Sequence, residues 1–306
     1  MTGIRPGGRI VPFLALTLSG LCWGMGFPLG KLALREVGPA HMILLRFAIA
    51  SLVALPFALR AEARALFRSP PVLIAGFLYG VAFLIQFEGL SQVTVSLAAL
   101  LVGAMPALVA VAAWLMGERV SRASWIGVAG ATIGAALIAG KPEGAGTPYG
   151  IALSLFSLLI FLGWLLTLKR APETKDPMAV PAVTVLVAVA TILPIALILY
   201  GPPPLALSPV AWAGIVGQGV FATFVATAAW AYGAARVGSA AAGVFINIEP
   251  LIGALIGITL FGDPAGVGLI GGGLLIICGS IVVVLGERSA PAAAELQAAA
   301  RGLSNE

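Results

Sequence analysis

The sequence predicts an all-α membrane protein in which ten transmembrane helices form two inverted five-helix repeats. Of its 306 residues, 60% are hydrophobic and only 9% are charged, and the mean hydropathy is +1.08. Soluble domains have about 25% charged residues. The composition therefore excludes a soluble enzyme, and it also excludes a disordered chain, which needs low hydrophobicity. Two further observations support the prediction: apolar segments of spanning length recur along the chain, and its second half resembles its first.

The spans are placed by length, because a helix needs about 20 mostly apolar residues to cross a bilayer. Pro/Gly pairs or clusters of charge separate the candidates. The predicted spans are 11–31, 41–59, 72–91, 95–116, 123–140, 149–169, 179–200, 209–236, 239–261 and 265–285. The first span is too long for the core of a signal peptide, so we expect it to stay uncleaved.

The spans divide the chain into two similar units. We expect an N-terminal segment at 1–10, a first repeat at 11–140, a linker at 141–148, a second repeat at 149–286 and a polar tail at 287–306. Cytoplasmic loops of membrane proteins carry an excess of Lys and Arg. With both termini in the cytoplasm, 13 of the 17 Lys and Arg residues lie on the cytoplasmic side. Those on the opposite side are Lys31, Arg35 and Lys141. We therefore expect a multi-pass protein of the bacterial cytoplasmic membrane.

Prolines, glycines and loop residues recur at matching positions in the two halves. At shifts of 138 and then 144 residues the pairs are Lys31/Lys169, Pro39/Pro177, Pro56/Pro194, Gly89/Gly233, Val93/Val237, Ala98/Ala242 and Pro106/Pro250. After a one-residue insertion, the pairs are Gly117/Gly262, Gly127/Gly272 and Gly134/Gly279. An odd number of spans in each repeat makes the halves run in opposite directions, an arrangement that suits alternating access.

Several motifs resemble those of one family. The motifs are Trp23-Gly24-Met25-Gly26-Phe27, Lys31, Pro39, Leu45-Arg46-Phe47, Pro106, Gly117-Glu118-Arg119, Trp125-Ile126-Gly127, Glu249-Pro250 and Gly262-Asp263. Together they resemble EamA-type transporters of the drug/metabolite transporter superfamily over residues 11–285. The resemblance implies ten helices, a central cavity between the repeats and export of small metabolites, often amino acids. Gly262-Asp263 departs from the commoner Gly-Glu, in a loop that we expect to be exposed.

Charged residues inside the predicted spans are candidates for function, because each costs about 2.5–3.5 kcal/mol at a helix centre. Glu249 lies near the midpoint of span 239–261, beside Asn247. It is interpreted as binding the ammonium group of a substrate or taking up a proton, with a protonated, hydrogen-bonded Glu as the structural alternative. Arg46 and Glu88 lie near span ends, so we expect structural roles, either snorkelling to the interface or pairing with each other. Lys31 is given the same interpretation.

Aromatic and polar residues outline the predicted cavity. Tyr79, Phe83 and Gln86 share one face of the third span. The repeat shift carries this face to Thr223, Thr227 and Trp230, and the first helices of the two repeats add Trp23 and Trp164. The alternative for Trp164 and Trp230 is contact with lipid. A pocket with few fixed charges suits zwitterionic, partly apolar solutes.

Prolines within spans are predicted to act as hinges. A proline removes one backbone hydrogen bond and frees a carbonyl, which persists in a membrane only where it is buried or lines a cavity. The residues assigned to gating are Pro28, Pro106 and Pro250.

The prediction is therefore a secondary transporter that exports amino acids or similar small metabolites. The alternative is a proton-coupled multidrug antiporter. No catalytic constellation is present, so we expect neither an enzyme nor a cofactor or metal. His41 is isolated, and Cys22 and Cys278 are expected to be buried small side chains. The expected partners are a small-molecule solute and the lipid bilayer, with no nucleic acid, and a monomer is the working expectation.

Overall fold

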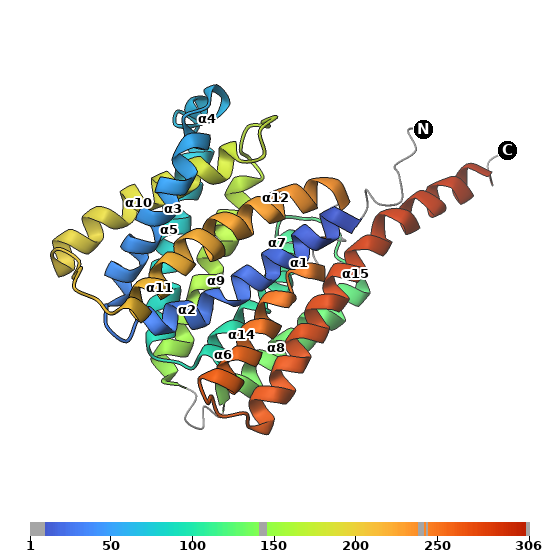
Figure 1. Cartoon of the computed structure of the whole chain (residues 1–306). Helices are drawn as coiled ribbons and strands as arrows, with labels where there is room; N and C mark the ends of the chain where they lie inside the picture. The colour runs from blue at the N-terminus through green and yellow to red at the C-terminus, as the bar shows by residue number, and fades with distance from the viewer. Residues whose placement is uncertain (1–9, 141–145, 238–241, 243, 304–306) are drawn as a thin grey trace.

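The computed structural model describes residues 10–140, 146–237, 242 and 244–303. Helices form both halves of the chain (Figure 1). The first half contains α1 (Ile10–Gly24), α2 (Gly26–Ala33), α3 (Pro39–Ala58), α4 (Ala61–Leu66), α5 (Pro70–Ser91), α6 (Val95–Val102), α7 (Met105–Leu115) and α8 (Arg122–Gly140). The second contains α9 (Pro148–Leu168), α10 (Ala179–Tyr200), α11 (Pro209–Gly217), the π-helical segment η2 (Gln218–Val225), α12 (Ala226–Val237), α14 (Ile248–Leu260) and α15 (Val267–Leu303).

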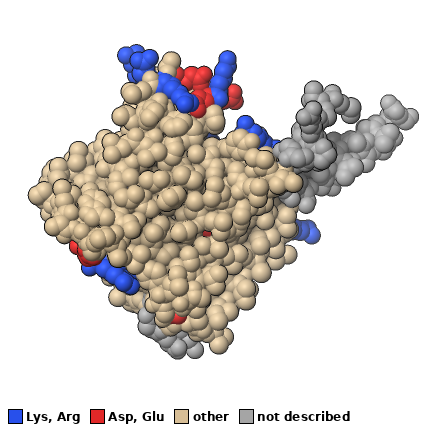
Figure 2. All heavy atoms as spheres, viewed as in Figure 1, with Lys and Arg blue, Asp and Glu red and all other residues tan. Residues whose placement is uncertain are grey.

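The helices confirm the predicted polytopic all-α fold. Eight helical stretches in the described residues are long and apolar enough to cross a membrane. Two shorter apolar helices, Arg122–Ile138 and Ile248–Leu260, occupy the fifth and ninth predicted spans. Figure 2 shows charged side chains gathered toward the ends of the visible face, with a broad uncharged belt between them. The belt is the surface that a bilayer would cover.

Proline and short polar side chains define several helix starts. Pro39, Pro70, Pro148 and Pro209 are each the first residue of a helix, where the missing N–H removes no internal hydrogen bond. Thr94, Thr147 and Ser208 precede helices, and their hydroxyl oxygens accept from the N–H three residues later. These local signals explain why most predicted spans start within about three residues of the observed helices.

The glycines of α8 and α15 show that the two halves are inverted. A Cβ atom at Gly127 would collide with the carbonyl oxygen of Gly279, and one at Gly134 would collide with that of Gly272. The two helices are therefore antiparallel. Because α8 and α15 are the last spans of their repeats, and these glycines are also the repeat-matched ones, a pseudo-twofold axis relates the halves.

The other helix contacts follow the same symmetry. Helix α5 packs on α9 in the same way that α12 packs on α1, and the equivalent helices α3 and α10, and α6 and α14, also meet. These contacts form the seam between the two halves. The buried core lies along the seam and includes Phe47, Phe87, Leu97 and Leu101. A site built at the seam therefore draws its side chains from both halves.

Some details of the fold add to these expectations or differ from them. Helix α15 continues into the predicted polar tail at 287–306, as far as Leu303. Cys278 is exposed, because it lies on the outward surface of α15, whereas Cys22 is buried as expected. Part of predicted span 239–261 lies outside the described residues, and its helix α14 begins at Ile248. The start of α1 and the C-terminal end of α15 lie at the same end of the bundle (Figure 1).

Candidate solute site at the seam

Arg46 lies at the centre of the candidate site. It projects from α3 and is only 2% exposed. Its Nε atom donates a 2.8 Å hydrogen bond to the Thr223 hydroxyl of η2 in the other half. The guanidinium carbon lies 4.0 Å from the ring centroid of Phe83, a cation–π geometry. The interpretation of Arg46 as a snorkelling residue or a partner of Glu88 is therefore wrong: α3 turns the side chain toward the seam, and its partner is Thr223.

An aromatic stripe surrounds the guanidinium. Tyr79, Phe83 and Phe87 occupy every fourth position of α5, and the Tyr79 and Phe83 ring centroids are 4.9 Å apart. Helix α9 adds Phe161, 4.9 Å from Phe83, and Trp164, 5.0 Å from Tyr79. The predicted neighbour Gln86 is buried, but Phe87 rather than Gln86 continues the stripe. The structure thus brings Tyr79, Phe83 and Trp164 together as one wall.

The second half contributes a π-helical turn. The Thr223 hydroxyl donates a 2.9 Å hydrogen bond to the Gln218 carbonyl five residues earlier, within the π-helical segment, whose backbone hydrogen bonds also span five residues. Where the chain returns to α-helix, the Thr227 hydroxyl donates to the Thr223 carbonyl at 2.6 Å. Thr227 also lies near the Tyr79 side chain of α5. Such π-turns are frequent at functional sites.

Gln218, which the sequence analysis missed, links the π-turn to the first helix. Its side-chain nitrogen donates to the Gly26 carbonyl, directly after the break between α1 and α2. Its side-chain oxygen is buried without a partner in the described residues. The Trp164 indole nitrogen and the Asn247 side-chain oxygen are likewise buried and unpartnered there. Unpaired polar atoms in an apolar bundle mark a place where another molecule can supply the hydrogen bonds.

Trp23, Trp230, Asn247 and Glu249 complete the predicted set. The Trp23 and Trp230 ring centroids are 5.5 Å apart, so α1 and α12 bring the two indoles into contact. Asn247 is buried, and its side-chain nitrogen donates to the Val244 carbonyl at 3.3 Å. Glu249 is half-buried at the second position of α14, close enough to Arg46 for their charges to attract.

The three predicted hinge prolines stand just after breaks in spans. Pro28 is the third residue of α2, Pro106 the second of α7 and Pro250 the third of α14. Met25, the Gly103–Ala104 pair and the turn at Ile246–Asn247 form the breaks. Discontinuous helices of this kind build binding sites in secondary transporters, because the broken ends expose backbone groups near the midplane.

Comparison with known proteins identifies the family. The EamA-like transporter family matches residues 11–140 and 148–285, which together make up most of the chain. The chain belongs to the EamA-like transporter family.

Two similar proteins extend the match over the whole fold. An "Uncharacterized transporter" from Archaeoglobus fulgidus is 24% identical over 280 residues, which cover 89% of this chain and 98% of the relative. A solved crystal structure is similar over 93% of this chain and 99% of its own, with a TM-score of 0.63 and 22% identity. The latter similarity concerns the fold alone.

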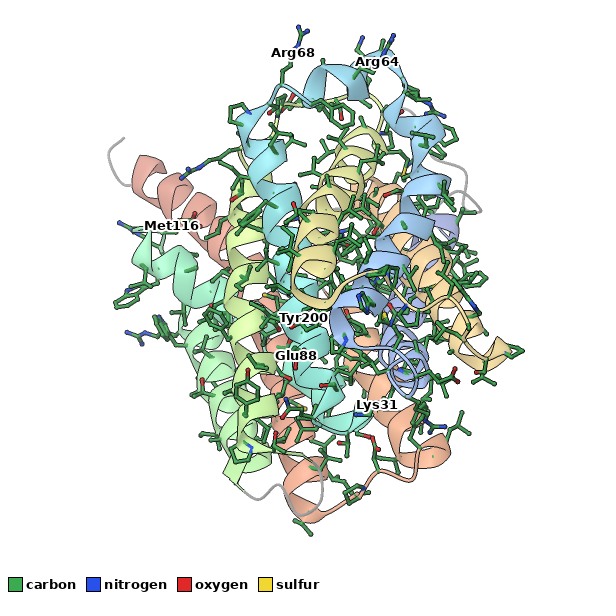
Figure 3. The ribbon with its side chains drawn as sticks, turned by 90° about the vertical axis from the view of Figure 1, so that its left-hand side faces the viewer. Lys31, Arg64, Arg68, Glu88, Met116 and Tyr200 are labelled. Carbon is green, nitrogen blue, oxygen red and sulfur yellow. The ribbon has the colours of Figure 1, made fainter. Side chains whose placement is uncertain are left out.

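The ends of this EamA-like transporter carry polar contacts between its halves. We call them the Lys31 end and the α4 end, which Figure 3 shows on opposite sides, with Arg64 and Arg68 marking the latter. At the Lys31 end, one Asp263 carboxylate oxygen accepts from both the N–H and the hydroxyl of Ser96, each at 2.7 Å. At the α4 end, Arg60 and Asp176 form a 2.7 Å ion pair.

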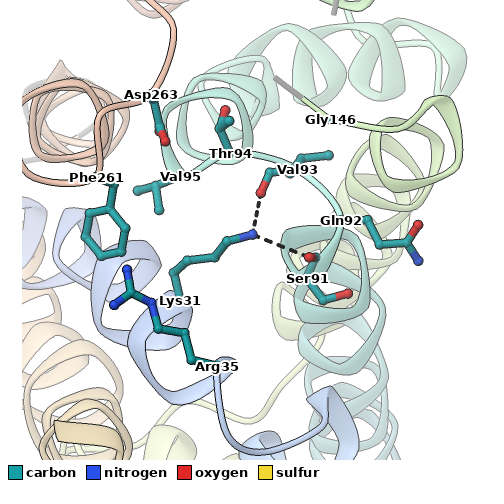
Figure 4. A pocket seen from close by; sticks show the side chains of 10 residues that line it. All are labelled: Lys31, Arg35, Ser91, Gln92, Val93, Thr94, Val95, Gly146, Phe261 and Asp263. Atoms are coloured by element: carbon teal, nitrogen blue, oxygen red, sulfur yellow. Dashed lines mark hydrogen bonds between the residues drawn. The ribbon is translucent and has the colours of Figure 1, made fainter. Parts of the chain in front are cut away.

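A pocket of about 380 Å³ opens beside the first of these contacts (Figure 4). The Lys31 ammonium points away from Asp263 and donates to the Leu90 and Val93 carbonyls, each at 2.6 Å. It therefore neutralises the C-terminal end of α5. A second pocket, of about 560 Å³, lies at the α4 end between residues 62–69 and 172–175. His41 also has a structural contact, 2.9 Å from the Gly201 carbonyl oxygen.

Proposed function

We propose that this EamA-like transporter is a secondary transporter that exports amino acids or similar small metabolites by alternating access. The observation that carries the proposal is the junction of Arg46 from the first half with Thr223 from the second, inside a wall of aromatic side chains. Because the Arg46 guanidinium contacts both halves, its surroundings change when the halves move relative to each other. Arg46 is the only cationic side chain among the described residues of this junction and its aromatic wall. A site with one fixed positive charge suits solutes that carry few charges.

The broken helices and the end contacts support a mechanism. Pro28, Pro106 and Pro250 follow the breaks, and the N–H that each proline lacks removes one backbone hydrogen bond that would otherwise resist bending. Asp263–Ser96 would close the Lys31 end, and Arg60–Asp176 the α4 end. Breaking one contact while the other holds would open the seam to one side at a time. We place the α4 end in the cytoplasm, because it carries Arg60, Arg64 and Arg68.

The test is counterflow of radiolabelled amino acids into proteoliposomes that contain the purified protein. Trp230→Ala is expected to slow exchange, because it removes one of the two indoles that are in contact at the seam. Trp125→Ala is the matched control: Trp125 lies on the surface, 5.5 Å from Trp114, and its loss should leave exchange unchanged. Absence of exchange for every amino acid would contradict the proposal.

The alternative is a proton-coupled multidrug antiporter, and Glu249 is the observation that favours it. A carboxylate at the start of α14, half-buried near Arg46, is a suitable proton carrier. Under this alternative a pH gradient would drive transport of cationic drugs, and amino acids would not exchange.

A further inference from the structure

We propose that Arg46 binds the carboxylate of the transported solute through its two terminal nitrogens, so that the site takes zwitterionic carboxylates in preference to the matching amines. This inference rests on the proposed function and adds the residue that selects the substrate.

Arg46 leaves several of its possible hydrogen bonds unmade. Its Nε atom donates to Thr223, but in the described part of the chain neither terminal nitrogen has a hydrogen-bonding partner. A guanidinium cannot lose its proton under ordinary conditions, and its N–H groups require acceptors when the side chain is buried. A carboxylate is the acceptor whose two oxygens match the planar fork of an arginine.

Neighbouring side chains impose one orientation on the Arg46 guanidinium. Phe83 lies against the guanidinium at 4.0 Å, with the Phe87 and Phe47 centroids at 5.4 and 5.7 Å. Aromatic rings contact the positive charge but accept no strong hydrogen bonds. Thr223 fixes the Nε edge. The aromatic rings and Thr223 thus hold the group in one orientation while its terminal nitrogens remain available.

Two opposite charges, those of Arg46 and Glu249, lie near each other at the seam without pairing. Glu249 is close enough to attract Arg46, yet in the described part of the chain no ion pair joins them. An opposed but unpaired cation and anion complement a zwitterion, whose carboxylate would meet Arg46 and whose ammonium would meet Glu249. Direct pairing of Arg46 with Glu249 would leave no such site.

The experiment compares three competitors that share one side chain. Counterflow of radiolabelled phenylalanine, leucine, threonine and glutamine first identifies the amino acid that wild-type protein exchanges fastest. Unlabelled amino acid, its primary amide and its decarboxylated amine then compete for that exchange. Loss of a hydrogen-bonded charge pair lowers affinity by about tenfold or more, so the amino acid should compete at least that much better than the other two.

Arg46→Gln should bring the three competitors to within about twofold of one another, since the variant has no charged fork to prefer a carboxylate. Arg46→Lys, which keeps the charge, should retain part of the preference. It replaces Arg46→Gln in the experiment if the glutamine variant does not fold. Arg64→Gln is the control: Arg64 is exposed on α4, and its loss should leave the preference intact. A merely structural role for Arg46 would weaken all three competitors alike and preserve their ratio.

The outcomes separate the two proposals. If amino acids exchange but the amide or the amine competes equally well with wild-type protein, the carboxylate assignment is overturned and the transport function stands. A competitor ratio that is unchanged in Arg46→Gln or Arg46→Lys overturns it in the same way. If no amino acid exchanges with wild-type protein, the proposed function fails, and the assignment fails with it.

Discussion

Arg46 and Thr223 are joined by a 2.8 Å hydrogen bond that links α3 of the first half to the π-turn of the second. The π-turn makes this bond possible, because the Thr223 hydroxyl donates five residues back to Gln218 and presents its oxygen to Arg46. The wider turn thus positions an acceptor for a buried cation that belongs to the other repeat.

The first prediction concerns that acceptor. Thr223→Val keeps the shape of the side chain but leaves the Arg46 Nε atom without a partner, so we expect a loss of about 1–3 kcal/mol in stability. The measurement is the melting temperature in detergent. Thr184→Val is the matched control, since the buried Thr184 hydroxyl donates only within its own helix, and the expected loss is smaller. Equal losses of stability in the two variants would show that the hydrogen bond between Arg46 and Thr223 adds no stability beyond that of a bond within one helix.

The second prediction concerns the contact between α8 and α15. Gly127→Ala places a methyl group against the Gly279 carbonyl and within 2.9 Å of the Val283 nitrogen. Overpacking of this kind costs about 1–3 kcal/mol, and the melting temperature should fall. A Cβ atom at Gly130, on the same helix, would lie 3.6 Å from its nearest neighbour, so Gly130→Ala should be neutral or stabilising. A tolerated Gly127→Ala would contradict the close antiparallel packing.

The third prediction concerns the Lys31 end. Asp263→Ala removes the acceptor of the Ser96 N–H and the nearer acceptor of its hydroxyl, which keeps only the Ala254 carbonyl at 3.2 Å, so the two halves should separate there more readily. The measurement uses protein in which Cys22 and Cys278 are replaced by alanine and Thr94→Cys introduces a single cysteine in the adjacent pocket. This cysteine should react faster with a membrane-impermeant maleimide when Asp263→Ala is also present than when Asp263 is retained. Glu118→Ala, at an exposed position that the repeat matches to Asp263, should leave the rate unchanged. Equal rates with and without Asp263 would exclude a closing role.

The fourth prediction concerns pH. Hydrogen bonds from the Ser208 hydroxyl and backbone N–H hold the pKa of Glu36 below its usual value. A carboxyl whose folded pKa is lowered stabilises the protein above its unfolded pKa, and the contribution is lost as the pH falls through the folded value. The melting temperature should therefore fall on acidification below about pH 4.3, the ordinary pKa of Glu, and fall less in Glu36→Gln. Glu173→Gln removes an exposed carboxylate at the other end and should follow the wild type; identical curves for all three proteins would contradict the prediction.

The sequence predicts the spans well because the bilayer imposes their length and polarity on each segment separately. It predicts the seam less well, since the seam depends on how helices rotate against each other. Residues 86 and 87 of α5 both lie near the face of Tyr79, and Phe87 continues the aromatic stripe because it lies beside Phe83 and 5.4 Å from the Arg46 guanidinium carbon of α3. The outcome at Gln86 could not be read from α5 alone.

Arg46 and the π-turn show the same limit. Arg46 is eight residues into α3, a position that equally suits an interfacial residue, and its burial follows from contact with η2. The π-turn has an unremarkable apolar sequence, yet its span has 26 residues where the equivalent span of the first half has 22. That difference in length was the available signal, because a π-turn takes up additional residues within one helix.

The last prediction concerns Glu249, whose proposed partner is either the ammonium group of the solute or a proton. Glu249→Gln removes the negative charge at nearly constant shape, and counterflow should fall about tenfold or more. Glu88→Gln, which changes a half-buried carboxylate on α5, is the control, and this variant should exchange normally.

A pH gradient then distinguishes the two roles proposed for Glu249. If Glu249 binds ammonium alone, the gradient has no effect on wild-type transport; if it carries a proton, the gradient accelerates the wild type and not the variant. Unchanged transport in Glu249→Gln would exclude both roles, because neither survives without the carboxylate.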